Sequence, residues 1–190
     1  MDFRRLLISI RLAITPGAER RAKYLRRKKV FRSMGKNCLI MKRKIPLYPE
    51  LISFGNNVRI ASNVSFLTHD VVHEVLNNMD MKERMEFPEK VGCISIGNDV
   101  FIGAGTRILY DVRIGSKVII GTGSIVTHDI PDNTVVAGVP ARKIGTFDNY
   151  VENIKKELKE TTLDQRSKEY QYDKIEYLWQ EFCEKHPETK

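Results

Sequence analysis

The sequence predicts a mainly β protein, a parallel β-helix shaped as a triangular prism with N-terminal helices and a C-terminal helical tail. The first observation is an aliphatic residue at every sixth position of one stretch, and the second is a glycine after four of these six residues. The aliphatic series is Ile96, Ile102, Ile108, Ile114, Ile120 and Val126, and the glycines are Gly97, Gly103, Gly115 and Gly121. Helices repeat every 3.6 residues and strands every 2, whereas a period of six is typical of a coil with one hexapeptide on each of three faces.

The third observation is a break in this period. Earlier repeats start at Met34, Ile40, Phe54, Ile60 and Phe66, separated by a Pro-containing strip over 45–49. Residues 68–92 are rich in charge, Asn and Met and have no six-residue phase. We therefore expect a β-helix domain over 34–146 with a protruding loop at 68–92, which re-enters the prism at Ile94 or Ile96. Long loops in compact repeat domains are usually functional.

Two helices are predicted in the N-terminal segment, residues 1–33. The helix over 3–14 has an apolar face that we expect to pack on the β-helix; the alternative is that this face lies on a membrane with the arginines toward anionic headgroups. Its members are Phe3, Leu6, Leu7, Ile10 and Ile14. Thr15 and Pro16 are suited to the N-cap and first position of a second helix, ending near residue 29. Its expected inner face is Ala18, Ala22 and Leu25.

The tail over 147–190 changes to a Lys/Glu-rich helical composition. It keeps apolar positions at Tyr170, Ile175, Leu178, Trp179 and Phe182. Because the last coil of a repeat domain exposes strand edges, we expect the tail to cap the open end of the prism or to pack on a neighbouring subunit.

Composition limits the partners and the location. The net charge is +8, and up to Lys44 the only acids are Asp2 and Glu19. Such basic ends attract nucleic acid, anionic lipid or phosphorylated ligands, but no nucleic-acid motif accompanies the charge, so we expect no nucleic-acid partner. There is no apolar run of transmembrane length and no apolar signal core. Cys38, Cys93 and Cys183 are widely spaced, which favours reduced thiols and a cytoplasmic location, with the basic N-terminal helix as a candidate for peripheral membrane contact.

Several stretches together resemble the hexapeptide-repeat acyltransferases. They are the ERRAKYLRR helix, the loop after Thr68-His69-Asp70, the hexapeptide array and IVTHDIPDNTVVAGVPAR at 125–142. The likeness runs from about 18 to 146 and is greatest to the galactoside, maltose and capsular or lipopolysaccharide sugar O-acetyltransferases. It implies a left-handed β-helix, a homotrimer with active sites in grooves between subunits, and acetyl-CoA as co-substrate with no metal. The implied reaction is direct transfer to a sugar hydroxyl in bacterial surface polysaccharide biosynthesis.

Acetyl transfer to a hydroxyl needs a base, and histidine suits this role because its pKa lies near the working pH. His69 opens the loop and matches the family's catalytic histidine. His73 corresponds to a second histidine of the galactoside branch, and with Asp70 it is a candidate for substrate binding. Asn63 resembles a substrate-binding asparagine, with a purely turn-forming role as the alternative.

The remaining candidates concern the co-substrate. The backbone N–H of Ala104 matches the family's donor to the oxyanion of the thioester carbonyl. Thr122, Thr127 and His128 align with positions that contact pantetheine. Arg142 matches a residue near the phosphates of coenzyme A, where a guanidinium fits phosphate geometry, and Lys143 is expected to assist.

Other readings remain open. A zinc enzyme like the γ-class carbonic anhydrases would need His69, His73 and His128, but these lack that family's ligand spacing. A non-catalytic β-helix scaffold would need neither the loop nor its histidine. An N-acetyltransferase acting on an amino sugar would keep the fold and the co-substrate and change only the acceptor.

Overall fold

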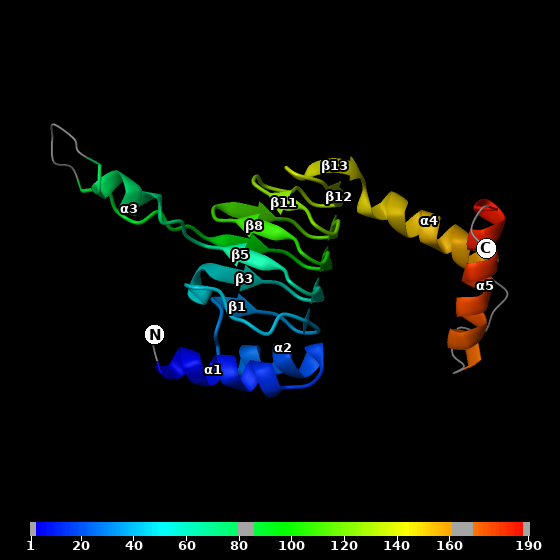
Figure 1. Cartoon of the computed structure of the whole chain (residues 1–190), viewed down its shortest axis with the longest axis horizontal. Coiled ribbons are helices and arrows are strands. Elements are labelled where there is room, and N and C mark those ends of the chain that lie inside the picture. Colours follow the sequence, from blue (N-terminus) through cyan, green and yellow to red (C-terminus); the bar gives the residue numbers. More distant parts are fainter. Residues whose placement is uncertain (1–2, 80–85, 161–168, 188–190) are drawn as a thin grey trace. The chain divides into compact units, whose positions relative to one another are not determined.

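The computed structural model describes residues 3–79, 86–160 and 169–187 (Figure 1). The chain forms two compact units, residues 1–150 and 151–190. The first contains every strand of the described chain, together with the N-terminal helices. The second contains most of α4 (Phe147–Glu160) and all of α5 (Glu169–Lys185).

Three parallel sheets form the faces of the first unit, so the predicted mainly β architecture is confirmed. Every strand pair is parallel except β12 with β13, which is antiparallel. The first sheet is β1 (Ser33–Met34), β3 (Ile52–Phe54), β6 (Ile94–Ile96) and β9 (Val112–Ile114). The second is β2 (Leu39–Ile40), β4 (Val58–Ile60), β7 (Val100–Ile102), β10 (Val118–Ile120), β12 (Thr134–Ala137) and β13 (Arg142–Gly145). The third is β5 (Ser65–Leu67), β8 (Arg107–Leu109) and β11 (Ile125–Val126).

The register explains the six-residue period. Ile102 and Ile120 are aligned in neighbouring strands and both are fully buried, and Ile108 and Ile114 are buried on the other two sheets. Residues stacked on successive coils are 18 apart in the sequence in the regular part of the array, 20 apart in the first coil, 16 apart in the last, and 42 apart across the protruding loop. Because each face takes one hexapeptide, the aliphatic residues of all three faces meet in one continuous core.

The glycines of the repeat are needed for close stacking. A Cβ on Gly97 would lie 2.7 Å from the carbonyl carbon of Gly115 in the next coil, so no side chain fits there. The turns themselves are made two residues later by residues with left-handed backbone, such as Asn57, Asp99 and Lys117. At this corner glycine is therefore required for the close approach of neighbouring coils, and not for a left-handed backbone.

The protruding loop leaves the prism after β5 and returns at Ile94. His69 and Val91 form an antiparallel bridge at its base. Beyond this bridge lies the short helix α3 (Val72–Asn77), and the side chain of Asn77 both donates to and accepts from the backbone of Phe87. These bonds hold the two arms of the loop together at the end of α3, away from the prism.

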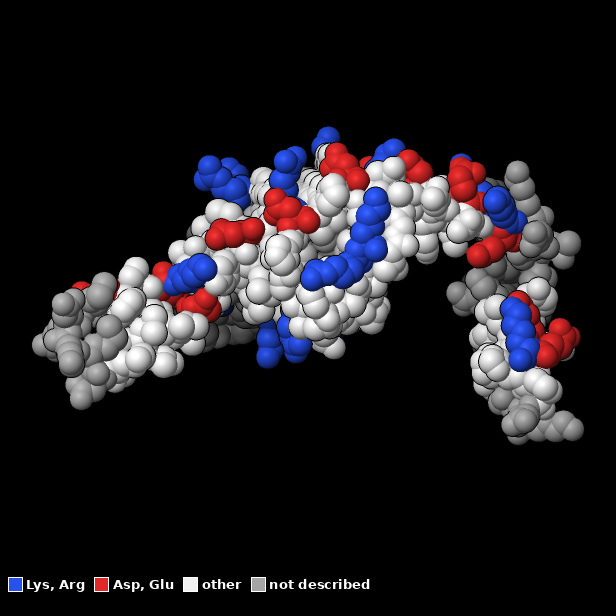
Figure 2. All heavy atoms as spheres, turned by 90° about the horizontal axis from the view of Figure 1, so that it is seen from above, with Lys and Arg blue, Asp and Glu red and all other residues white. Residues whose placement is uncertain are grey.

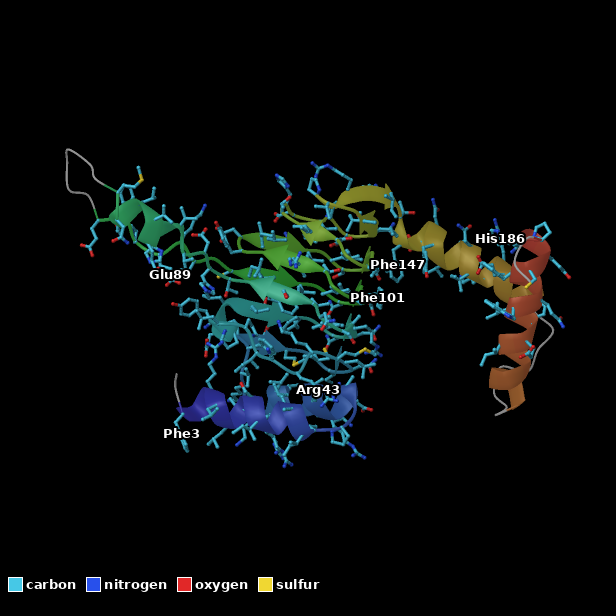
Figure 3. The ribbon with its side chains drawn as sticks, in the orientation of Figure 1. Phe3, Arg43, Glu89, Phe101, Phe147 and His186 are labelled. Atoms are coloured by element: carbon cyan, nitrogen blue, oxygen red, sulfur yellow. The ribbon has the colours of Figure 1, made fainter. Side chains whose placement is uncertain are left out.

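Helix α1 (Phe3–Ile14) lies across the β1 end of the prism, and its orientation differs from the prediction (Figure 1). Ile8 and Leu12 are buried, whereas the predicted inner face is exposed: Phe3, Leu6, Leu7, Ile10 and Ile14. Phe3 points away from the strands in Figure 3. The helix has two apolar stripes, and the smaller one fills the end of the prism.

Helix α2 (Ala18–Arg27) begins later than predicted, with Gly17 at its N-cap. The Thr15 hydroxyl donates instead to the carbonyl of Arg11 in the preceding helix, 2.6 Å away, so Thr15 and Pro16 belong to the turn. Ala22 and Leu25 are buried as expected and Ala18 is half-buried. The buried Arg21 donates to the carbonyls of Ile40 (3.0 Å) and Thr15 (2.9 Å), which fixes α2 to β2.

In the second unit, α5 keeps its apolar residues exposed. Ile175, Leu178, Trp179 and Phe182 are exposed, and the rings of the last two are stacked with centroids 5.4 Å apart. The side chain of Tyr170 lies outside the described residues. The partner predicted for the tail therefore stays a prediction.

Candidate active site

His69 lies at the corner where β5 ends and the loop begins. It follows Thr68, which is buried, and its backbone is fixed by the bridge to Val91. Its imidazole is half-buried, and Nδ1 is buried without a hydrogen-bond partner in the described chain. The same is true of Nδ1 of His73, which is carried by α3 at the base of the loop.

Tyr48 packs against His69, a contact that no pattern in the sequence indicates. The two rings are edge-to-face, with centroids 5.5 Å apart. The Tyr48 hydroxyl donates to Oε2 of Glu89 at 2.8 Å, and this bond raises the pKa of the phenol. Figure 3 shows Glu89 at the base of the loop. Tyr48 thus connects the strip before β3 to the returning arm of the loop. It also lines a pocket of about 330 Å³ with Ile8 of α1.

Asp70 does not orient either histidine. Its carboxylate accepts hydrogen bonds from the Tyr110 hydroxyl (2.7 Å) and from the backbone N–H of Val72 (3.2 Å). The bond from Tyr110, followed by that from Val72, holds the pKa of Asp70 below its ordinary value. Lys90 lies over the Tyr110 ring, 5.1 Å from its centroid. This arrangement ties the start of α3 and the end of the loop to the corner after β8.

A second set of candidates lies at the opposite edge of the third sheet, before its strands begin. The backbone N–H of Gly105 donates to Ser62, and that of Gly123 donates to Ala104, so successive corners stack. Asn63 has a left-handed backbone (φ 59°), as expected for a turn-forming residue. The N–H groups of Ala104 and Thr122 have no acceptor among the described residues. This edge therefore presents free backbone donors.

Arg142 and Lys143 extend this second set. Both are exposed on β13, where Arg142 is paired with Ala137. Ala137 stacks on Gly121 of the preceding coil, since a Cβ on Gly121 would lie 2.9 Å from the Cβ of Ala137. Arg142, which is paired with Ala137, therefore lies one coil beyond the corner at Gly121 and Thr122. Among the described residues, the Arg142 guanidinium donates only to the neighbouring carbonyl of Ala141, at 3.2 Å.

The predicted site residues thus fall on two edges of one sheet. Phe66, Ile108 and Val126 are in register, so Thr127 and His128 share the far edge with His69. The Thr127 hydroxyl and Nδ1 of His128 are 2.8 Å apart. Six residues of extended chain separate Asn63 from His69, which corresponds to roughly 20 Å. The structure thus places His69, Asp70, Thr127 and His128 at one edge, with His73 in the loop that leaves it, and Asn63, Ala104, Thr122 and Arg142 at the other edge.

Metal-binding groups and surface charge complete the description of this region. No group of three or more His, Cys, Asp or Glu side chains within the described ranges could hold a metal ion. Charges of both signs are interspersed on the prism surface seen from above in Figure 2.

Known proteins resemble this chain over the coil region. The chain is 46% identical over 104 residues to Protein CapG of Staphylococcus aureus, a match that covers 54% of this chain and 56% of the relative. It is 47% identical over 95 residues to the galactoside O-acetyltransferase of Escherichia coli K12, covering 49% and 43%. The chain thus spans about half the length of these curated relatives.

A solved galactoside acetyltransferase in complex with coenzyme A has a similar fold, with a TM-score of 0.57 and 28% identity. The match covers 78% of this chain and 82% of that one. Residues 93–128, which include β6 to β11, match the family described as "Bacterial transferase hexapeptide (six repeats)". Through its repeat and these relatives, the chain is thus similar over part of its length to the bacterial hexapeptide-repeat transferases.

Proposed function

We propose that this protein is an acetyl-CoA-dependent O-acetyltransferase that acts on a sugar hydroxyl. We further propose that its coils wind left-handed and that residues 34–146 form the catalytic domain. The observation that carries the proposal is the placement of His69. It stands where the hexapeptide register breaks, its ring is packed by Tyr48, and its Nδ1 has no partner in the described chain. Relatives named as acetyltransferases support the reaction class.

The residues at the edge before β8 and β11 fit the co-substrate. Space is open beside Gly123, where an added Cβ would meet nothing within 4 Å, so a pantetheine arm can lie close to the backbone. Arg142 and Lys143 are exposed beyond this edge and would bind the phosphates of coenzyme A. Acetyl-CoA supplies the acetyl group as a thioester.

His69 would remove the acceptor's proton. As the sugar oxygen bonds to the carbonyl carbon and the bond to sulfur breaks, negative charge develops on the carbonyl oxygen. The free N–H of Ala104 would donate to that oxygen. His69 would then return its proton to the departing sulfur, so no free alkoxide is needed near neutral pH.

The separation of the two edges supports a site shared between copies of the chain. Because roughly 20 Å of strand lies between the corner of Asn63 and that of His69, one chain does not bring His69 to the Ala104 donor. In a homotrimer, His69, Thr127 and His128 of one subunit would face Ala104, Thr122 and Arg142 of the next. The acceptor would enter between them, beside His73, Asp70 and Asn63, and the loop at 68–92 would select it.

On the basis of the family resemblance, we propose that the acceptor is a sugar of bacterial surface polysaccharide. We place the reaction in the cytoplasm because the cysteines are free thiols. In the described chain, no helix combines the length and apolar character needed to cross a bilayer.

A panel of acceptors tests the function. Purified protein is given acetyl-CoA with free sugars, lipid-linked sugars and amino sugars, and release of the coenzyme A thiol is measured. We expect release with hydroxyl acceptors, and a loss of about 10²–10⁴ in turnover for His69→Ala with acetyl-CoA binding kept. His186→Ala is the matched control, since His186 lies in the tail. Normal turnover in His69→Ala would contradict the role of His69, and acetylation of amino sugars alone would contradict the O-acetyl assignment.

A further inference from the structure

We propose that the outer face of α1 and α2 docks onto the surface of an anionic lipid bilayer. This face comprises the exposed apolar stripe of α1 and the basic groove between the two helices. The proposal is independent of the acetyl-transfer chemistry.

The apolar stripe has the spacing of one helix face. Phe3, Leu7, Ile10 and Ile14 recur at intervals of three and four residues and are half to almost three-quarters exposed. Ile8 and Leu12, on the opposite side, already supply the contact with the prism. Thus α1 does not need the exposed stripe for packing, and a helix of 12 residues is too short to cross a bilayer. It is suited to lying in the plane of the interface.

The charge beside this stripe identifies the partner. A groove of about 420 Å³ between α1 and α2 is lined by Arg11, Arg20, Lys23 and Arg27, together with Ile14 and Tyr24. Helix α1 contains no acid, and the one acid of α2, Glu19, is paired with Lys23 at 2.8 Å. Cations next to an apolar stripe match anionic headgroups above acyl chains.

The same charges disfavour a second copy of the chain as the occupant. Two such faces placed against each other would bring two sets of these arginines and lysines together. Up to Lys44 the only acids are Asp2 and Glu19, whereas positive and negative side chains are mixed on the face seen from above in Figure 2. An anionic bilayer would bury the apolar stripe at the acyl boundary and bind the cations of the groove with its headgroups.

Vesicle flotation of the full chain tests the docking. We expect binding to phosphatidylcholine vesicles that contain phosphatidylglycerol, weak binding to phosphatidylcholine alone, and a decrease with added salt. Leu7→Ser/Ile10→Ser should reduce partitioning by about tenfold or more, because each CH₂ group buried in the bilayer adds to the free energy of membrane binding. The matched control is Ile175→Ser/Leu178→Ser, which removes similarly exposed residues from α5.

Charge reversal tests the groove separately. Arg20→Glu/Arg27→Glu should lower partitioning by about fivefold or more for each site. Lys36→Glu/Arg113→Glu changes the net charge equally at exposed sites outside the two helices and should have a much smaller effect.

Three results would overturn the proposal. They are no binding of the wild type to anionic vesicles, equal losses in test and control pairs, and a smaller assembly for Leu7→Ser/Ile10→Ser by light scattering. The last would identify the stripe as an interface between copies. Acetyl transfer to a soluble acceptor is measured in the same samples, so loss of docking is distinguished from loss of catalysis.

Discussion

The ring of Tyr48 stands edge-on to the imidazole of His69, with 5.5 Å between centroids and 85° between planes. Tyr48 comes from the irregular strip before β3 and has a left-handed backbone, with φ 41°. Two segments that are distant in the hexapeptide pattern therefore meet at the proposed base, and Tyr48 is suited to positioning it.

Replacing Tyr48 should affect turnover more than binding. We expect Tyr48→Ala to lower kcat by about tenfold, because an aromatic pair contributes about 0.5–1.5 kcal/mol and holds the imidazole in one orientation. The KM for acetyl-CoA should not change. Tyr48→Phe keeps the ring and loses only the bond to Glu89, so it should retain most activity. Equal losses in both variants would show that the hydroxyl, and not the ring, matters.

The Asp70–Tyr110 hydrogen bond predicts a pH-dependent contribution to stability. Because this bond lowers the pKa of Asp70 below 3.8 in the folded chain, ionised Asp70 stabilises the fold above that value. The contribution is lost as pH falls through the lowered pKa. The melting-temperature difference between wild type and Tyr110→Phe should therefore shrink between about pH 7 and about pH 2. Tyr150→Phe, at an exposed tyrosine, is the control. A difference that does not change with pH would contradict this contribution.

The sequence predicted most of the prism and only part of the site. The period of six determines which residue of each hexapeptide is buried, so Ile102, Ile114 and Ile120 could be placed without a structure. Tyr48 lies in a strip that has no period, so no pattern could pair it with His69. Tyr110 could have been found, because the register that aligns Phe66 with Ile108 places it beside Thr68.

The orientation of α1 could not be predicted from amphipathicity. Its sequence has two apolar stripes, and amphipathicity alone predicts the larger as the inner one. Tertiary contacts decide the orientation: the Arg43 guanidinium donates to the carbonyl of Ala13, and Leu12 fills the end of the core. Such contacts join residues about 30 positions apart and leave no local periodicity.

The coil stacking at Gly97 makes a strong prediction for stability. Gly97→Ala should destabilise the fold by about 1–3 kcal/mol, since the new Cβ would overlap backbone that no rotamer change can move. Gly123→Asn is the control, because that site is open and asparagine tolerates its left-handed backbone. Denaturant unfolding measures both, and equal stability of the two variants would show that neighbouring coils can separate at low cost.

The proposed phosphate contact at Arg142 predicts a binding defect. We expect Arg142→Ala to raise the KM for acetyl-CoA by about tenfold, the value of one charge-assisted hydrogen bond, with a smaller change in kcat. Arg113→Ala removes an exposed arginine from β9 and should leave this KM unchanged. An unchanged KM in Arg142→Ala would remove Arg142 from the site.

The two edges of the third sheet predict that defective subunits complement each other. His69→Ala lacks the base but keeps the donor edge, and Ala104→Pro keeps the base but has no N–H at that position. Each variant alone should be inactive. When they are mixed by unfolding and refolding together, about one groove in four should combine an intact base with an intact donor from its neighbour.

Activity near that fraction would establish a shared site, and an assembly of three 21.9 kDa chains should be seen in light scattering. If Ala104→Pro does not assemble, Arg142→Glu provides a partial lesion on the same edge without altering the backbone, and the mixture is then assayed at acetyl-CoA concentrations well below the wild-type KM. No recovery in either mixture, with trimers present, would show that each chain contains a whole site. That result would require His69 and its donor to lie on one edge, against the register of β5, β8 and β11.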